Sequence, residues 1–130
     1  MPATLKSMLA EANAAVERID TDAAQALIEI GALLLDVRDG PELEKAGRAA
    51  GSHHVPRGML EFRADPGSPF ADDEFRFDRP VVVHCASGGR AALAGKLLQD
   101  MGFEKVYNLG GFKDWKDGGG AVGEPVDPEM

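Results

Sequence analysis

The sequence predicts an α/β fold in which a central, mostly parallel sheet carries helices on both faces. Short uncharged runs rich in Val and Leu alternate along the chain with amphipathic segments. Short connections between such runs are typical of parallel strands joined by helices. The length of 130 residues fits one compact domain, and the 44% apolar and 28% charged residues are typical of a folded globular chain.

Two helices are expected at the N-terminus. The first is amphipathic and covers residues 4–18, so that residues 1–18 form an N-terminal helical segment. Its apolar positions recur at spacings of three and four, and they are Leu5, Met8, Leu9, Ala12 and Val16. The second helix covers residues 22–30, with Thr21 as its expected N-cap.

Four further elements are expected before residue 66. Ala32–Asp36 is an apolar run that ends in a carboxylate, as buried parallel strands do. Gly47 stops a short helix, and Pro56 favours an extended segment before it. In chain order the elements are a strand at 32–36, a helix at 42–46, a strand at 53–55 and helical turns at 58–65.

The second half of the domain contains the strongest predicted strand. Val81–Cys85 is uncharged and largely β-branched. The elements expected after it are a helix at 89–101, a strand at 105–109, a turn at Gly110-Gly111 and a helix at 112–116. Residues 118–130 are rich in Gly and Pro and are expected to form a flexible tail. Residues 19–117 are then the folded domain.

Charge and cysteine content exclude several classes of function. Fourteen Lys and Arg against 22 Asp and Glu give a net charge of −8, so neither nucleic acid nor an anionic membrane surface is expected as a partner. The longest apolar run, Ala32–Leu35, is far too short to span a membrane. Charged residues interrupt the first twenty positions, so no signal peptide is predicted. The single cysteine forms no internal disulfide, which favours a cytoplasmic protein.

Cys85 is the candidate nucleophile. It ends the strongest predicted strand, and ligands of parallel sheets bind at the carboxyl ends of the strands. The next four residues are small, which lets the backbone curl around the sulfur with its N–H groups inward; they are Ala86, Ser87, Gly88 and Gly89. The positive end of the following helix adds to this environment, which favours the thiolate. The alternative is an ordinary buried core cysteine.

These motifs resemble the single-domain rhodanese family. The active-site half of the family is similar to three segments, which are His84–Ala94, Gly102-Phe103 and Val106–Trp115. Two upstream signatures are similar to Leu35–Glu42 and to Gly47–Gly58. The resemblance covers about residues 20–117, nearly the whole domain.

The resemblance implies a rhodanese-like, five-stranded sheet and a sulfurtransferase. Family members carry sulfane sulfur as a persulfide on the loop cysteine. They take it from thiosulfate or another small anionic donor and pass it to cyanide, a thiol or a protein acceptor. By this resemblance Cys85 is the sulfur carrier, and no cofactor or metal is required. The backbone N–H groups that would cradle the persulfide belong to Ala86, Ser87, Gly88, Gly89 and Arg90.

Asp36, Arg57 and His84 are further candidates. Asp36 and Arg90 stand at strand ends, where a pair between them would fix the loop or be merely structural. Arg57 follows Pro56 near the expected pocket mouth and is either a contact for an anionic donor or a solvated surface residue. His84 is expected to be a satisfied core histidine.

Two alternative functions stay open. The first is a weakly catalytic sulfur carrier or protein-binding module that uses the same loop, and turnover with a small acceptor separates it from the enzyme. The second is a cysteine phosphatase or arsenate reductase, because the His-Cys pair followed by a small loop and Arg also resembles the motif of cysteine phosphatases. Phosphatases have five residues in that gap, whereas four separate Cys85 from Arg90. The shorter loop makes a smaller cradle, which suits a single sulfur atom.

Overall fold

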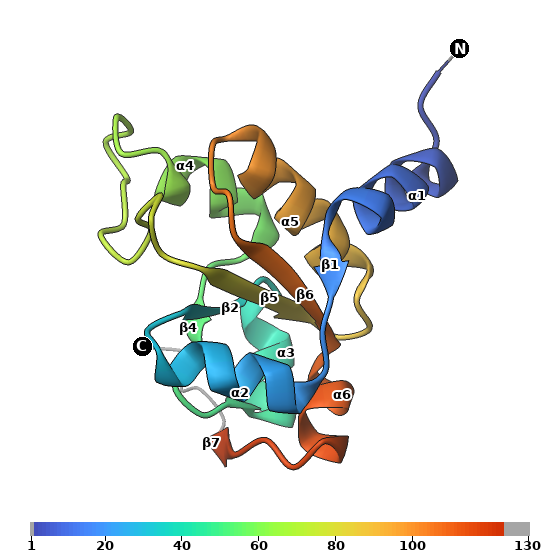
Figure 1. The fold of residues 1–130 in the computed structure, drawn as a ribbon, viewed down its shortest axis with the longest axis vertical. Coiled ribbons are helices and arrows are strands. Elements are labelled where there is room, and N and C mark those ends of the chain that lie inside the picture. The colour runs from blue at the N-terminus through green and yellow to red at the C-terminus, as the bar shows by residue number, and fades with distance from the viewer. Residues whose placement is uncertain (1, 124–130) are drawn as a thin grey trace.

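The structure is a computed structural model that describes residues 2–123, and a five-stranded sheet forms its centre (Figure 1). The strand order is β1-β6-β5-β2-β4, and all neighbours in this sheet are parallel. Its strands are β1 (Glu17–Arg18), β2 (Leu33–Asp36), β4 (His53–His54), β5 (Val81–Cys85) and β6 (Val106–Gly111). A separate antiparallel pair joins β3 (Arg48–Ala49) to β7 (Val122–Gly123).

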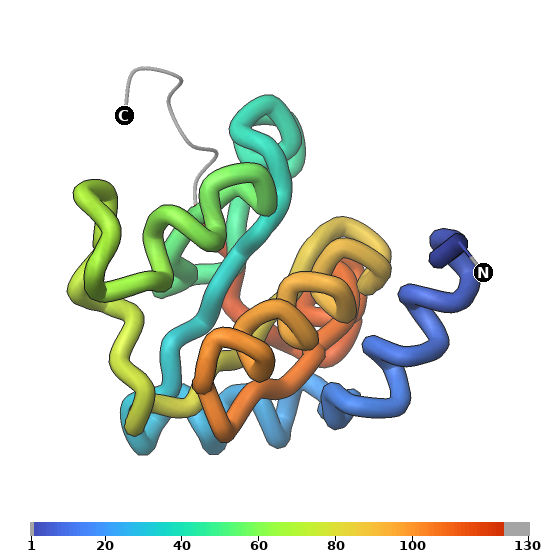
Figure 2. The backbone as a smooth tube through the Cα atoms, turned by 90° about the horizontal axis from the view of Figure 1, so that it is seen from above, coloured from blue at the N-terminus to red at the C-terminus, as the bar shows by residue number. Residues whose placement is uncertain are grey.

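Helices cover both faces of the central sheet, so the predicted fold class is confirmed. Figure 1 shows α4 and α5 above the sheet and α2 and α6 below it. The helices are α1 (Leu5–Ala15), α2 (Thr21–Glu29), α3 (Gly40–Ala46), α4 (Leu60–Ala64), α5 (Gly89–Asp100) and α6 (Phe112–Asp117), with a 3-10 turn η1 (Arg57–Met59). The first helix, α1, lies beside α5 on the outside (Figure 2). None of the helices within residues 2–123 is long and apolar enough to cross a membrane.

The side chains of the two central strands alternate between two cores, as the pleat of a strand requires. Leu33, Leu35, Val81, Val83 and Cys85 belong to the core beneath α4 and α5. Leu34 and Val82 belong to the core that faces α2 and α6. Successive residues at the end of β5 therefore face opposite sides of the sheet, and this separates His84 from Cys85.

The N-terminal helix ends at Ala15, earlier than the expected residue 18. Val16 is extended, and Glu17–Arg18 pairs with β6 as the edge strand β1. Pairing with a strand far along the chain therefore overrides the local helical pattern. The expected N-cap of α2 was also wrong. Asp20 caps this helix by accepting the Ala23 N–H at 2.9 Å, while the Thr21 hydroxyl donates to the Asp114 carbonyl at 3.0 Å.

Gly110 and Gly111 belong to β6 and are not the turn that the sequence predicted. The register between β5 and β6 shifts after Val83, so that His84 pairs with Gly110. Gly110 has a φ of +101°, which glycine adopts without strain, and the strand continues through this bulge. Of the expected tail at 118–130, Val122–Gly123 forms β7, and residues 124–130 lie outside the described residues.

Candidate active site

Cys85 is completely buried at the end of β5, and its sulfur accepts two backbone hydrogen bonds. The Gly88 N–H lies 2.9 Å from Sγ and the Ala91 N–H 3.4 Å from it. Gly88 has a φ of +109°, which turns the chain back toward the sulfur as α5 begins. Cys85 is therefore part of the core, as one alternative held, but two converging N–H donors distinguish it from an ordinary core cysteine. Of the expected cradle residues 86–90, Gly88 donates to the sulfur, and Ala91 just beyond them also does.

The loop after Cys85 packs directly on β6. A Cβ at Gly111 would collide with the Ala86 carbonyl oxygen, and a Cβ at Gly88 would lie 3.5 Å from Gly110 Cα. Asn108, which is buried, accepts the Gly110 N–H at 2.7 Å and donates to the Gly88 carbonyl at 3.4 Å. Sequence analysis missed Asn108 as a support, because the bulge that brings it to the loop leaves no local signal.

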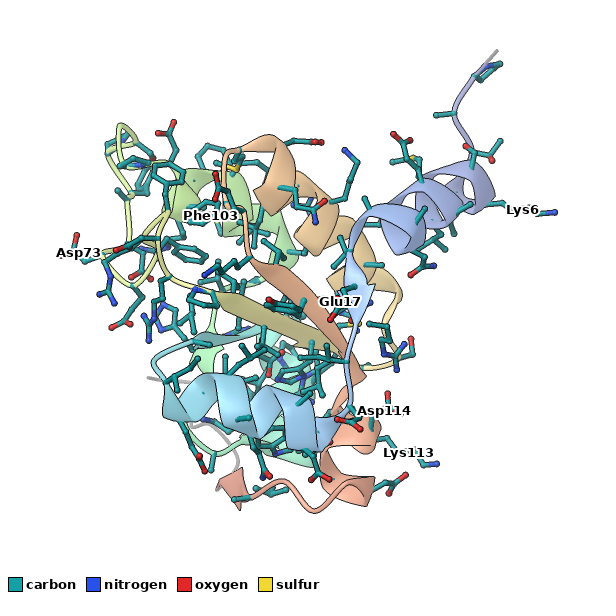
Figure 3. The ribbon with its side chains drawn as sticks, in the orientation of Figure 1. Lys6, Glu17, Asp73, Phe103, Lys113 and Asp114 are labelled. Carbon is teal, nitrogen blue, oxygen red and sulfur yellow. The ribbon has the colours of Figure 1, made fainter. Side chains whose placement is uncertain are left out.

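Asp114, at the start of α6 beside the end of β6 (Figure 3), completes this platform. Its Oδ2 atom accepts the Gly111 N–H at 2.7 Å and lies 3.3 Å from Arg18 Nη2 on β1. The side chains of Arg18 and Asp114 are both more than half exposed. Strand β1, strand β6 and α6 are thus tied together where the loop rests on the sheet.

Arg90 pairs with Glu42 and not with Asp36, so the expected pair was wrong. Its Nη1 and Nη2 atoms donate to the two oxygens of Glu42 at 2.7 and 2.9 Å. These hydrogen bonds from Arg90 lower the pKa of Glu42 from 4.5 to about 2, and they raise the pKa of Arg90. The pair connects the first turn of α5 to α3 and holds the start of the helix next to the loop.

Asp36 is instead paired with Arg38, and both side chains are buried. Arg38 donates from Nη2 to Asp36 Oδ2 at 2.8 Å and to the Gly47 carbonyl at 2.9 Å. Burial opposes the charge on Asp36, but the hydrogen bonds from Arg38 outweigh it and lower the pKa of Asp36. The Arg38 guanidinium also lies over the ring of Phe112, 4.5 Å from its centroid. The pair joins the end of β2 to α3 and α6.

Arg57 lies in a groove, and within residues 2–123 its hydrogen bonds go to Val37 and Glu61 and not to the loop. Its N–H donates to the Val37 carbonyl at 3.2 Å, and its guanidinium pairs with Glu61 at 3.0 Å. The groove has a volume of about 240 Å³ and runs along α5; besides Arg57, it is lined by Met8, Glu11, Leu93, Lys96, Leu97 and Asp100. Arg57 therefore stands near the carboxyl edge of the sheet, engaged with a neighbouring carboxylate.

His84 is buried on the opposite side of the sheet from Cys85, but it is only half satisfied. Its Nδ1 atom lies 3.4 Å from the Cys85 carbonyl oxygen. Its Nε2 atom has no hydrogen-bond partner among residues 2–123. The expectation of a fully satisfied core histidine was therefore wrong at this atom.

Known proteins have the same fold as this chain and are similar to it in sequence. A profile of the rhodanese-like domain family matches residues 11–118. The thiosulfate sulfurtransferase GlpE of Pseudomonas fluorescens is 39% identical, over 77% of this chain and 84% of its own length. The solved structure of RPA3614 from Rhodopseudomonas palustris is described as a protein of unknown function and possible tyrosine phosphatase. It is 44% identical, with a TM-score of 0.83, and the match covers 95% of this chain and 99% of that one.

A sulfur-transferring protein is among the structural relatives. The polysulfide-sulfur transferase homodimer of Wolinella succinogenes has a TM-score of 0.73 and 30% identity, with 96% of this chain and 90% of that chain covered. The match to the family profile spans all the central strands and the loop after Cys85. The chain therefore belongs to the rhodanese-like domain family, as its motifs predicted, and is a rhodanese-type sulfurtransferase.

Proposed function

We propose that this sulfurtransferase carries sulfane sulfur as a persulfide on Cys85. The observation that supports the proposal best is the pair of N–H groups, from Gly88 and Ala91, that converge on Sγ. Donors aimed at one sulfur atom stabilise negative charge there, which favours the Cys85 thiolate that accepts the sulfur and is released again at the end of the cycle. The N-terminus of the twelve-residue helix α5 adds its positive end to the same place.

The reaction has two steps. The Cys85 thiolate attacks the outer sulfur of a donor such as thiosulfate; a new S–S bond forms as the donor's own S–S bond breaks, and sulfite leaves with the electron pair. A nucleophilic acceptor, either cyanide or a thiolate on a small molecule or protein, then attacks the outer sulfur of the persulfide. The bond to Sγ breaks and its electron pair returns to Cys85 as the thiolate. Electrons and charge balance without a further reactant.

Because Cys85 is buried, the loop that follows it must move before a sulfur donor can reach Sγ. The residues directly above it are small, and Ala86 and Ser87 are exposed. A displacement of these residues opens a path to Sγ without disturbing the side chains of β5. The reduced thiol that the cycle needs is maintained by the cytoplasm, which is the proposed location.

The environment of Arg90 argues against phosphatase chemistry. An arginine that binds a phosphoryl group needs its guanidinium N–H donors free for the phosphate oxygens. In this loop, two of those donors are held by Glu42 at 2.7 and 2.9 Å. The same pair leaves the backbone N–H groups on the sulfur undisturbed, which suits transfer of a single sulfur atom.

Intact-mass measurement of the protein tests the proposal. Treatment with thiosulfate should add one sulfur atom, and a cyanide chase should remove it and release thiocyanate. The variant Cys85→Ser, which is nearly isosteric, should keep the fold and gain no sulfur. A sulfur atom on this variant, or none on the wild type with thiosulfate or an organic polysulfide, overturns the proposal. A persulfide that forms but turns over with no small acceptor identifies a sulfur carrier for a protein partner.

A further inference from the structure

His84 lies between two acceptors on the side of the sheet that faces α6. In the sheet, His84 of β5 is paired with Asp36 of β2, and the imidazole ring is fully buried. The Nδ1 atom is 3.4 Å from the Cys85 carbonyl oxygen, whereas Nε2 is 3.7 Å from Asp36 Oδ2. The first distance is that of a long hydrogen bond, and the second is too long for one.

A neutral imidazole has one N–H and therefore serves only one of these acceptors. Asp36 already accepts several hydrogen bonds, all of them from Arg38. The Cys85 carbonyl is the end of β5 and receives the closer contact from His84. The geometry thus favours the tautomer with the proton on Nδ1, since that proton has an acceptor within reach.

We propose that His84 is a positioning residue, which holds the Cys85 carbonyl from behind the sheet and thereby fixes the peptide group with which the loop leaves β5. The peptide group is planar, so the carbonyl of Cys85 and the N–H of Ala86 point in opposite directions. Fixing the oxygen therefore fixes the orientation of the Ala86 N–H and the start of the chain that leads to Gly88, whose N–H lies 2.9 Å from Sγ. The inference rests on the proposed role of Cys85 as the nucleophile.

Packing keeps the imidazole in this orientation. The ring stacks on Phe112 at a centroid distance of 6.3 Å and an interplanar angle of 26°. Phe112 in turn lies under Arg38, at 4.5 Å, and Lys116, at 5.2 Å. The stack on Phe112 of α6 and the pairing of His84 with Asp36 of β2 thus fix the plane in which the imidazole lies.

The protonation state of His84 should affect the loop at acidic pH. The charged groups around it are Asp36 and Arg38 from the end of β2, with Lys116 of α6 across the ring of Phe112. Burial, the largest influence, lowers the pKa of His84 below its ordinary value despite the opposing effect of Asp36. The ring is therefore neutral at neutral pH. On acidification Nε2 gains a proton that faces Asp36 and competes with Arg38 for its oxygens.

Three substitutions at this position separate the donor from the ring. In His84→Asn, an amide N–H occupies the place of Nδ1, whereas in His84→Gln it occupies the place of Nε2. In His84→Phe the stack on Phe112 remains and both nitrogens are lost. The measurements are the rate of persulfide formation with thiosulfate, the rate of Cys85 alkylation by iodoacetamide, and the ¹⁵N spectrum of the wild-type imidazole. Alkylation needs no sulfur donor, so it reports on the loop even if sulfur transfer fails.

The wild type should show the Nδ1–H tautomer at neutral pH. If they fold, the variants His84→Phe and His84→Gln should form the persulfide about tenfold more slowly than the wild type. This is less than the roughly 10²–10³ loss in rate on removal of a donor that contacts the reacting atom directly. His84→Asn should stay within about threefold of the wild type and should lose the change in rate that the wild type shows as His84 titrates. An Nε2–H tautomer, or equal rates in Asn and Gln variants, overturns the proposal even if His84→Phe does not fold. Failure of the wild type to form a persulfide, with alkylation still slowed in His84→Gln, would refute the proposed function alone.

Discussion

Replacement of Glu42 by Gln tests how the loop is held at the start of α5. Glu42 accepts two hydrogen bonds from Arg90, at 2.7 and 2.9 Å, and its backbone lies on α3, far from Cys85 in sequence. The substitution removes the carboxylate charge and keeps nearly the same side-chain volume. Arg90 then loses its ionic partner while the remainder of the loop sequence is unchanged. We expect the protein to fold, with reduced stability and a less constrained loop.

The pKa of Glu42 sets the size and the pH range of the effect. A fall from 4.5 to about 2 is equivalent to about 3 kcal/mol. The side chains of Glu42 and Arg90 are 33% and 37% exposed, so solvent screening reduces the contribution to about 1 kcal/mol. A carboxylate whose pKa is lower in the folded protein stabilises it fully above the unfolded value of 4.5. This stabilisation is lost as the pH falls toward about 2.

Urea unfolding followed by the fluorescence of Trp115, which is buried, measures the free energy of unfolding. Glu42→Gln should lower it by about 1 kcal/mol at neutral pH, and the difference from the wild type should shrink on acidification below pH 4.5. Glu44→Gln is the matched control, because Glu44 is exposed on the same helix. Equal losses in the two variants, or a difference that is independent of pH, would refute the reasoning.

Two substitutions and one insertion test the contacts of the loop. Gly111→Ala introduces a Cβ that collides with the Ala86 carbonyl. We expect the free energy of unfolding in urea to fall by about 1–3 kcal/mol and persulfide formation to be slower. Wild-type values in both measurements would contradict the close packing. Asn108→Ala leaves the buried Gly110 N–H without its acceptor, so thermal unfolding should reveal a loss of about 1–3 kcal/mol, and no loss would show that Asn108 is dispensable. Insertion of one glycine after Gly88 displaces its N–H from Sγ and should slow sulfur transfer by up to roughly 10²–10³, measured as thiocyanate release. The wild type should not hydrolyse an aryl phosphate, and ready hydrolysis without sulfur transfer would overturn the preference for sulfur chemistry.

The sheet was largely predictable because its strands have distinct residue types. Val81–Cys85 matches the predicted strand at both ends, since it is β-branched and flanked by a proline and a small-residue loop. Glu17–Arg18 was not predictable, because both residues are exposed and only their pairing with β6 makes them a strand. The end of β6 was misplaced for a related reason: a pair of glycines signals a turn locally, and only the pairing of Gly110 and Gly111 with β5 explains why the strand continues.

The position of the thiol was predictable, whereas the ion pairs around it were not. A cysteine between a strand and a run of small residues is a local pattern, and the structure places Gly88 N–H on its sulfur. The partner of Arg90 depends on which face of the sheet each side chain occupies. Leu35 faces α5, so the next residue, Asp36, faces away from it. Strict alternation along β2 thus already excluded a pair between Asp36 and Arg90, and the sequence interpretation did not apply it.

Each face of the sheet holds a different set of charged and polar groups near Cys85. On the α5 face, Cys85 Sγ is surrounded by core side chains and two N–H donors, and the nearby cation of Arg90 is neutralised by Glu42. On the opposite face, the cation of Arg38 is neutralised by Asp36. Both guanidinium groups are thus engaged by carboxylates, and the groups that donate to the sulfur are the backbone N–H groups of Gly88 and Ala91. Such peptide dipoles stabilise negative charge on the sulfur, whereas a free cation would favour retention of the anionic leaving group.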